Sequence, residues 1–161
     1  MATRDRVSGD ERALKDILYD REDALHTGTE MVKINAKMHE LAAKCNDPYI
    51  LEILAVYADR ADTLDLIFKK ASVGNYGKGA IYVIDNVSNN TCASPHTLDS
   101  IAKLDDHLFA AAKRGVIENH STYISTLDYL SENSTPKIKR AAKRELKRRA
   151  GDHRMFHILR H

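Results

Sequence analysis

Apolar residues recur every seven positions in the first third of the chain. Residues spaced in this way return to the same face of an α-helix. The pattern predicts one long helix over residues 10–45, with a possible break at 27–30, where Thr27 and Glu30 could form a capping box. The residues that follow the spacing are Ile17, Ala24, Met31, Met38 and Cys45.

A second amphipathic helix is predicted over residues 47–74. Asp47 and Pro48 supply the signals of a helix start, and Gly74 those of a helix end. At about 100° per residue, eight apolar side chains fall within one arc of the helix, and acidic residues fall opposite. The apolar residues are Ile50, Ile53, Leu54, Tyr57, Ala61, Leu64, Phe68 and Ala71, and the opposing acids are Glu52, Asp59 and Asp62.

The helical pattern is lost over residues 74–93. Three glycines between Gly74 and Gly79 precede a β-prone run at 80–84 and then a polar stretch. A segment of this length without a helical period is either a functional loop or a crossover connection. Its order of elements differs from a phosphate-binding loop, in which glycines follow a strand and precede a helix.

Two more helices are predicted after this connection. One begins at Ser94-Pro95 and ends near Gly115, and the other covers residues 117–133. Four helices with one long connection resemble the layout of ferritin-like bundles. We therefore expect an all-α antiparallel four-helix bundle over residues 1–135, followed over 136–161 by a basic helix and tail, in the same domain or as an appended arm.

Charge is distributed unevenly between these two parts. Residues 136–161 contain ten Lys/Arg and two acids, which gives +8, whereas the whole chain carries +2. Residues 1–135 therefore carry −6. On a helical wheel the cationic side chains cover one side of the basic helix, and Ile138, Ala141, Ala142 and Leu146 line the other.

The cationic side of this helix is the main candidate binding surface. Ten basic residues in one segment exceed what solubility requires, and they suit the phosphates of a nucleic acid or the carboxylates of an acidic protein. The alternative is pairing with the chain's own acids Glu52, Asp59 and Asp62, within one chain or in an oligomer. A membrane is not expected as a partner, because the apolar side is too small. The candidate binding residues are Lys137, Arg140, Lys143, Arg144, Lys147 and Arg148.

Metal binding is a second candidate chemistry. The inward Glu-x-x-His motifs of di-iron bundles are missing, and His26 with Glu30 has only one part of the spacing of hemerythrin-like bundles. His153, His157 and His161 follow an i, i+4, i+8 spacing, which places three imidazoles on one helix face. Frayed termini and the absence of an orienting partner weigh against a metal site there.

Nucleophilic catalysis has little support in the sequence. Cys45 lies on the apolar stripe and is expected in the core. Cys92 lies four residues before His96, but no third catalytic group is identifiable. A small-molecule site in the 74–93 connection would draw on Tyr76, Lys78, Tyr82 and Asp85.

These observations favour a non-enzymatic interaction protein that self-associates and uses its basic helix to bind a nucleic acid or an acidic partner. No cofactor is expected. The charged N-terminal residues and the shortness of the apolar runs predict a cytoplasmic protein with reduced thiols. Two alternatives stay open: a metal- or small-molecule-dependent bundle enzyme with its site in the 74–93 connection or between helices, and a structural oligomer whose basic helix pairs with its own acidic body.

Overall fold

The structure, a computed structural model, describes the backbone of residues 2–27, 31–74 and 76–158 and the side chains of 9–24, 31–74 and 76–151. These residues form nine helices and no strand, which confirms the all-α class. The helices are α1 (Ala2–Thr27), α2 (Met31–Lys44), α3 (Pro48–Tyr57), α4 (Ala61–Val73), α5 (Lys78–Asn89), α6 (Pro95–Ala102), α7 (Ala110–Glu118), α8 (Ile124–Asn133) and α9 (Pro136–Ile158).

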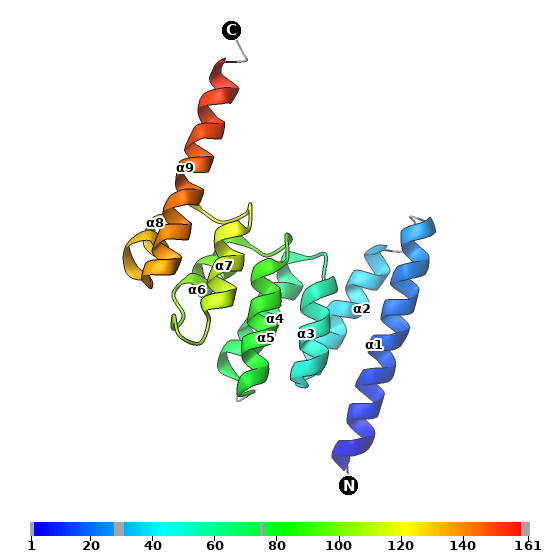
Figure 1. The fold of residues 1–161 in the computed structure, drawn as a ribbon. Helices are drawn as coiled ribbons and strands as arrows, with labels where there is room; N and C mark the ends of the chain where they lie inside the picture. The colour runs from blue at the N-terminus through cyan, green and yellow to red at the C-terminus, as the bar shows by residue number, and fades with distance from the viewer. Residues whose placement is uncertain (1, 28–30, 75, 159–161) are drawn as a thin grey trace.

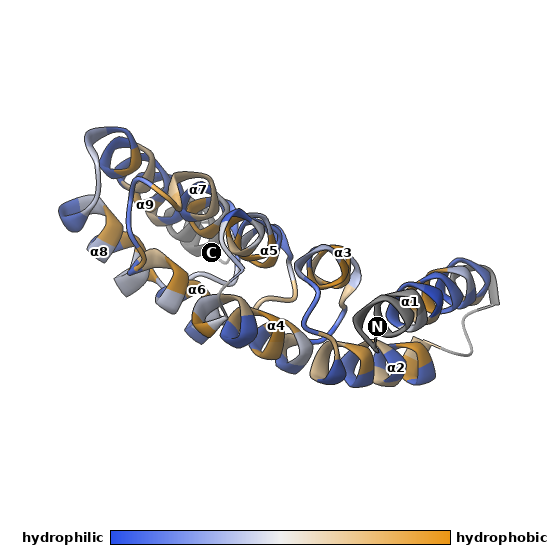
Figure 2. Ribbon diagram, turned by 90° about the horizontal axis from the view of Figure 1, so that it is seen from below, coloured by the Kyte–Doolittle hydropathy of each residue, from blue (hydrophilic) through white to orange (hydrophobic). Residues whose placement is uncertain are grey.

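The helices stand side by side as an extended array with α1 and α9 at opposite ends (Figure 1). Figure 2 shows two rows, with the odd-numbered helices in one and the even-numbered helices in the other. In the odd row α3 packs on α5, α5 on α7 and α7 on α9, and in the even row α2 packs on α4 and α6 on α8. Each helix contacts its near neighbours, which is the arrangement of helical repeat proteins.

An internal repeat underlies the even row. The tripeptide Thr-Leu-Asp begins at Thr63 in α4, at Thr97 in α6 and at Thr126 in α8, separated by 34 and 29 residues. All three threonines and the leucines that follow them are buried. Repeats of this length correspond to one supersecondary unit each.

Hydrogen bonds join these repeats into a ladder. The Thr97 hydroxyl donates to the Asp65 carboxylate at 2.6 Å, and the Thr126 hydroxyl donates to Asp99 at 2.8 Å. At the other end His39 Nδ1 lies 3.0 Å from the Thr63 hydroxyl. The ladder therefore links α2, α4, α6 and α8 and fixes the spacing of the even row.

A second series of contacts links the carboxyl ends of the odd helices, where backbone carbonyls lack helical partners. The Asn90 side-chain amide donates to Ala55 O at 2.9 Å and to Ala58 O at 3.0 Å, at the end of α3. The Asn119 side-chain amide donates in the same way to Asn90 O at 2.9 Å, after α5. Arg149 of α9 completes the series at the end of α7.

The predicted crossover at 74–93 is wrong, because residues 78–89 form α5. Val83, Ile84 and Val87 are buried at helical spacing on a helix that packs against α3, α4 and α7, so burial overrides the β preference of the run. Two of the glycines have structural roles. Gly77 forms a turn with a φ of 53°, and Gly79 allows close packing, because a Cβ there would lie 2.8 Å from the Pro48 side chain.

The ferritin-like layout of four long helices is not confirmed. The predicted 47–74 helix is two helices, because Ala58 is extended and ends α3. The predicted 94–115 helix is also two, because the Asp105 carboxylate accepts hydrogen bonds from the His107 and Leu108 amides in a turn. The predicted 10–45 helix is divided at the expected break, since α1 ends at Thr27 and α2 begins at Met31. Short helices bury their apolar faces against neighbouring repeats rather than in one four-sided core.

Candidate functional site

The amino end of α9 is fixed by Asp106, which lies in the loop between α6 and α7. Its carboxylate accepts hydrogen bonds from the Thr135 amide and from the Ser134 hydroxyl, the latter at 3.3 Å, and pairs with the buried Lys113. Burial alone would raise the pKa of Asp106, but the hydrogen bonds from Lys113 and Thr135 lower it below its ordinary value. α9 therefore begins at an ion pair that is sheltered from solvent.

One narrow apolar stripe attaches α9 to the array. Ile138 and Ala142 are buried, and Ala141 and Leu146 are partly buried against the core. The helix packs most extensively on α8 and also on α7. These are the four residues that the helical wheel places on one side of the segment, and the candidate Lys and Arg binding residues on the opposite side are exposed.

Two arginines of α9 have structural partners. The Arg149 guanidinium donates to Thr122 O at 2.7 Å and to Asn119 O at 2.9 Å, in the loop after α7. Glu145 accepts from Arg149 at 2.8 Å and from Arg148 at 2.7 and 2.8 Å. The hydrogen bonds from Arg148, followed by those from Arg149, lower the pKa of Glu145 to about 2.

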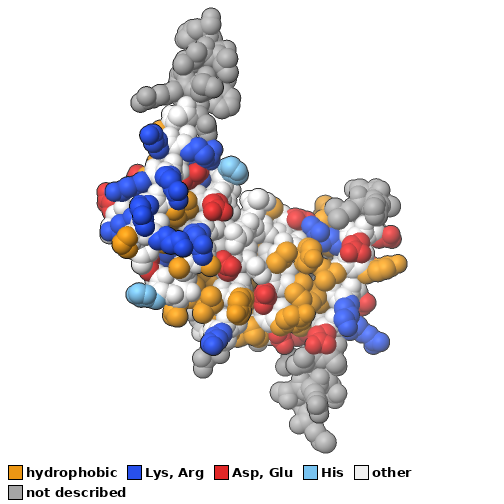
Figure 3. Space-filling model, viewed as in Figure 1, with side chains coloured by type: hydrophobic (Ala, Val, Ile, Leu, Met, Phe, Trp, Pro, Cys, Tyr) orange, Lys and Arg blue, Asp and Glu red, His pale blue; other side chains and the backbone are white. Residues whose placement is uncertain are grey.

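Five of the six predicted binding residues are free of acidic partners. No ion pair between side chains that the structure describes includes them, and all five are exposed. Arg140 Nε donates at 3.2 Å to Pro136 O, within its own helix. Lys and Arg side chains gather over α9 in Figure 3. We name this surface the basic face; it consists of Lys137, Arg140, Lys143, Arg144 and Lys147.

The acids expected to neutralise α9 lie elsewhere in the array. Asp59 pairs with Arg21 at 3.4 Å, and Asp62 pairs with Arg60. Glu52 belongs to α3, whereas α9 packs on α7 and α8. Among the described residues of one chain, the basic face therefore does not fold onto the acids named from the sequence.

The other predicted sites receive no support from the described residues. The side chains of His26, His153, His157 and His161 lie outside them. Elsewhere in the described part no three His, Cys, Asp or Glu side chains gather as metal ligands would.

The cysteines and the 74–93 segment do not form a catalytic constellation in the described structure. Burial raises the pKa of the Cys45 thiol to about 11, and Cys45 Sγ accepts a hydrogen bond from the Asp47 amide at 3.3 Å. The His96 ring packs edge-on against Tyr123, with centroids 5.8 Å apart. Lys78 and Tyr82 point from α5 into solvent, and Asp85 O accepts from the Asn89 side chain at 2.8 Å.

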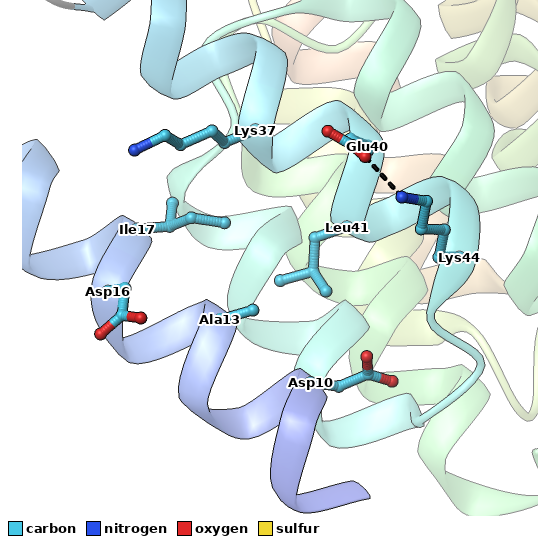
Figure 4. A pocket seen from close by; sticks show the side chains of 8 residues that line it. All are labelled: Asp10, Ala13, Asp16, Ile17, Lys37, Glu40, Leu41 and Lys44. Atoms are coloured by element: carbon cyan, nitrogen blue, oxygen red, sulfur yellow. Dashed lines mark hydrogen bonds and ion pairs between the residues drawn. The ribbon is translucent and has the colours of Figure 1, made fainter. Parts of the chain in front are cut away.

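A cleft of about 390 Å³ between α1 and α2 was not foreseen (Figure 4). Ala13, Ile17 and Leu41 give it an apolar floor, and charges of both signs form its rim. Lys44 pairs with Glu40 at 2.5 Å, and Lys37 pairs with Asp20 at 2.6 Å. The rim lysines are thus already engaged with carboxylates, so the cleft offers no concentrated charge to a ligand.

An exposed apolar surface on α3 and α5 was also missed by the sequence reasoning. Tyr49 and Val56 of α3 and Tyr82 of α5 are exposed, and Tyr57, placed inward by the helical wheel, is exposed as well. The Arg21 guanidinium lies 5.3 Å from the centre of the Tyr57 ring. The available signal was that Tyr49 and Val56 fall outside the apolar arc of their helix. We name Tyr49, Val56, Tyr57 and Tyr82 the tyrosine surface.

Comparison with protein families, with curated proteins and with solved structures finds no match for this chain. In the described part of the chain, no helix is both long enough and apolar enough to cross a lipid bilayer.

Proposed function

We propose that the protein is a non-enzymatic interaction protein that binds a polyanionic partner, a nucleic acid or an acidic protein, through the basic face of α9. The observation that carries this proposal is the set of five exposed Lys/Arg side chains without acidic partners among the described residues, on a helix that Asp106 holds at its amino end and Arg149 holds beyond the five residues. Like charges held close together on a rigid surface repel one another, and an anionic partner relieves this repulsion.

The repeat architecture supports the proposal independently. Helical repeat arrays present extended surfaces that bind other macromolecules.

Glu145 of α9 does not neutralise the basic face, because both of its carboxylate oxygens accept hydrogen bonds from Arg148 and Arg149. Counter-ion release then gives a binding free energy that depends on salt and little on sequence.

Fluorescence anisotropy across a salt series tests this proposal. The probes are a labelled twenty-nucleotide oligo-dT and labelled poly-glutamate. For three to five neutralised phosphates, oligo-dT affinity should fall about 20- to 100-fold between 50 and 200 mM salt. The variant K143Q/R144Q/K147Q should bind at least about tenfold more weakly than the unmodified chain at 50 mM salt.

The control variant R12Q/K15Q/K69Q removes the same number of Lys and Arg from exposed positions on α1 and α4. It should keep its affinity within about twofold if the charge of α9 is what binds. Absence of binding at low salt, indifference to salt, or equal losses in both triple variants would refute the proposal. Circular dichroism of all three proteins confirms that they are equally folded.

A further inference from the structure

The tyrosine surface and the basic face belong to the same row of helices. α3, α5, α7 and α9 are consecutive members of the odd row, and each packs on the next. Figure 3 views this side of the molecule, with hydrophobic side chains gathered over α3 and Lys/Arg over α9. The two surfaces are therefore parts of one face, with α7 between them.

The tyrosine surface has the composition of a protein interface. Tyr49 is 61% exposed, Val56 is 52% exposed and Tyr82 is 58% exposed. Single exposed apolar residues are ordinary, whereas a group of them on adjacent helices marks an interaction site. Tyr is enriched among the residues that dominate binding energy in protein interfaces.

Helix α7 leaves the path between these two surfaces open. Its exposed positions include Ala111, whose side chain is small, and Arg114, which adds a cation. Acids also border the path, since Glu118 is exposed at the end of α7 and Asp85 is half-buried on α5. With helices about 8–10 Å apart, the distance from α3 to α9 is about 25–30 Å, which an extended segment of about eight or nine residues spans.

We infer that this face binds an acidic protein segment that carries apolar side chains at one end, which places its carboxylates on the basic face and its apolar residues on the tyrosine surface. The inference rests on the proposed function, since the basic face supplies the electrostatic half of the site. Charge complementarity selects an acidic occupant, and the aliphatic Val56, on the same helix as Tyr49, favours protein side chains over phosphate. A nucleic acid would use the basic face but would gain nothing from an aliphatic side chain.

Matched peptides test the inference. The first is a labelled peptide of ten Glu followed by five Leu-Ser pairs, and the second replaces each Leu by Ser; both are also made in reversed order. The unmodified protein should bind the Leu peptide, in one of the two orders, at least about fivefold more tightly than its Ser counterpart. The variant Y49S/V56S should abolish this preference and leave the affinity for the Ser peptide unchanged.

Two further variants make the outcomes distinguishable. V32S/V73S removes apolar side chains that are 84% and 80% exposed on α2 and α4, in the other row, and should keep the preference for Leu. K143Q/R144Q/K147Q should weaken the binding of both peptides. Failure of both peptides and of oligo-dT to bind refutes the proposed function itself, whereas failure of the peptides alone, with oligo-dT still bound, overturns the inference. Two results would overturn the inference and leave the proposed function standing. One is equal binding of the Leu and Ser peptides in both orders. The other is a loss of oligo-dT binding in Y49S/V56S that is as large as its loss of Leu-peptide binding.

Discussion

At the scale of single residues, the basic side chains of α9 divide into two kinds. Arg148 and Arg149 are held by Glu145, and Arg149 also binds the loop carbonyls of Asn119 and Thr122. Lys143 and Lys147 have no acidic partner among the described side chains. Charge counted along the sequence cannot separate these kinds, because the division depends on which groups the fold brings within hydrogen-bonding distance.

The substitution Glu145→Gln tests the ion pairs that hold Arg148 and Arg149 within the fold. It should lower the free energy of unfolding by about 1–2 kcal/mol at pH 7, a value reduced from the full pKa shift because Arg148 is partly exposed. The pKa of Glu145 falls from 4.5 to about 2 on folding, so its carboxylate stabilises the protein above pH 4.5 and loses this effect as the pH falls toward 2. Urea unfolding at pH 7, 5 and 3 should therefore show a shrinking difference between variant and parent.

The control is Glu118→Gln, at an exposed carboxylate without an arginine partner among the described residues. Its effect should stay below about 0.5 kcal/mol. A Glu145→Gln difference that is the same at pH 7 and pH 3 would contradict the assignment of the ion pair.

At the scale of elements, α2 to α8 have only 8 to 14 residues each and are too short to be stable alone, so their positions are set by contacts between repeats. The Thr-Asp ladder is one such contact in the even row, and the Asn90, Asn119 and Arg149 series is its counterpart at the ends of the odd helices. Both series satisfy buried polar groups across a repeat boundary, so each repeat fixes the register of the next.

Thr126→Val tests the ladder with little change of shape. Thr126 is fully buried, and its hydroxyl is 2.8 Å from the Asp99 carboxylate, so the variant should lose about 1–2 kcal/mol of unfolding free energy. Thr91→Val, at an exposed position in the loop after α5, should cost less than about 0.5 kcal/mol. Equal costs in urea unfolding would show that the ladder contributes nothing.

At the scale of the whole molecule, the array has an open, neighbour-to-neighbour construction rather than one central core. The buried hydrophobic side chains form one cluster with members on every helix from α1 to α9. In such an array stability is approximately the sum of the repeats and of the interfaces between them. A local defect should therefore weaken nearby helices more than distant ones.

The substitution Ile138→Asp places a carboxylate in the buried stripe between α9 and the array. Hydrogen exchange should show lost protection in α7, α8 and α9 and a smaller change in α3 and α4, because burying an unpaired charge disrupts its own interface first. Lys137→Asp, at the exposed neighbouring position, is the control and should preserve protection. A uniform loss across all helices would indicate a single cooperative core instead.

Several features of this fold were determined by the sequence alone. Asp47 caps α3 by accepting from the Tyr49 amide at 2.8 Å, and Ser94 caps α6 by accepting from the Thr97 amide at 3.1 Å, as the residue types predict. Gly74 ends α4, and the predicted break at residues 133–136 coincides with the end of α8 at Asn133 and the start of α9 at Pro136. These signals act within a few residues, so they can be recognised in the sequence without knowing the fold. The all-α class and the charge of the C-terminal segment can be recognised in the same way.

The tertiary structure alone decided how the helices are arranged and which side chains remain available. Residues 78–89 became α5 because packing against α3, α4 and α7 buries Val83, Ile84 and Val87. The Thr-Leu-Asp repeat was visible in the sequence, but its ladder joins residues 27 to 32 positions apart. Whether a residue is buried, paired or free depends on such distant neighbours. For this reason the basic face could be named from the sequence, whereas the tyrosine surface beside it emerged only from the packing of the odd row.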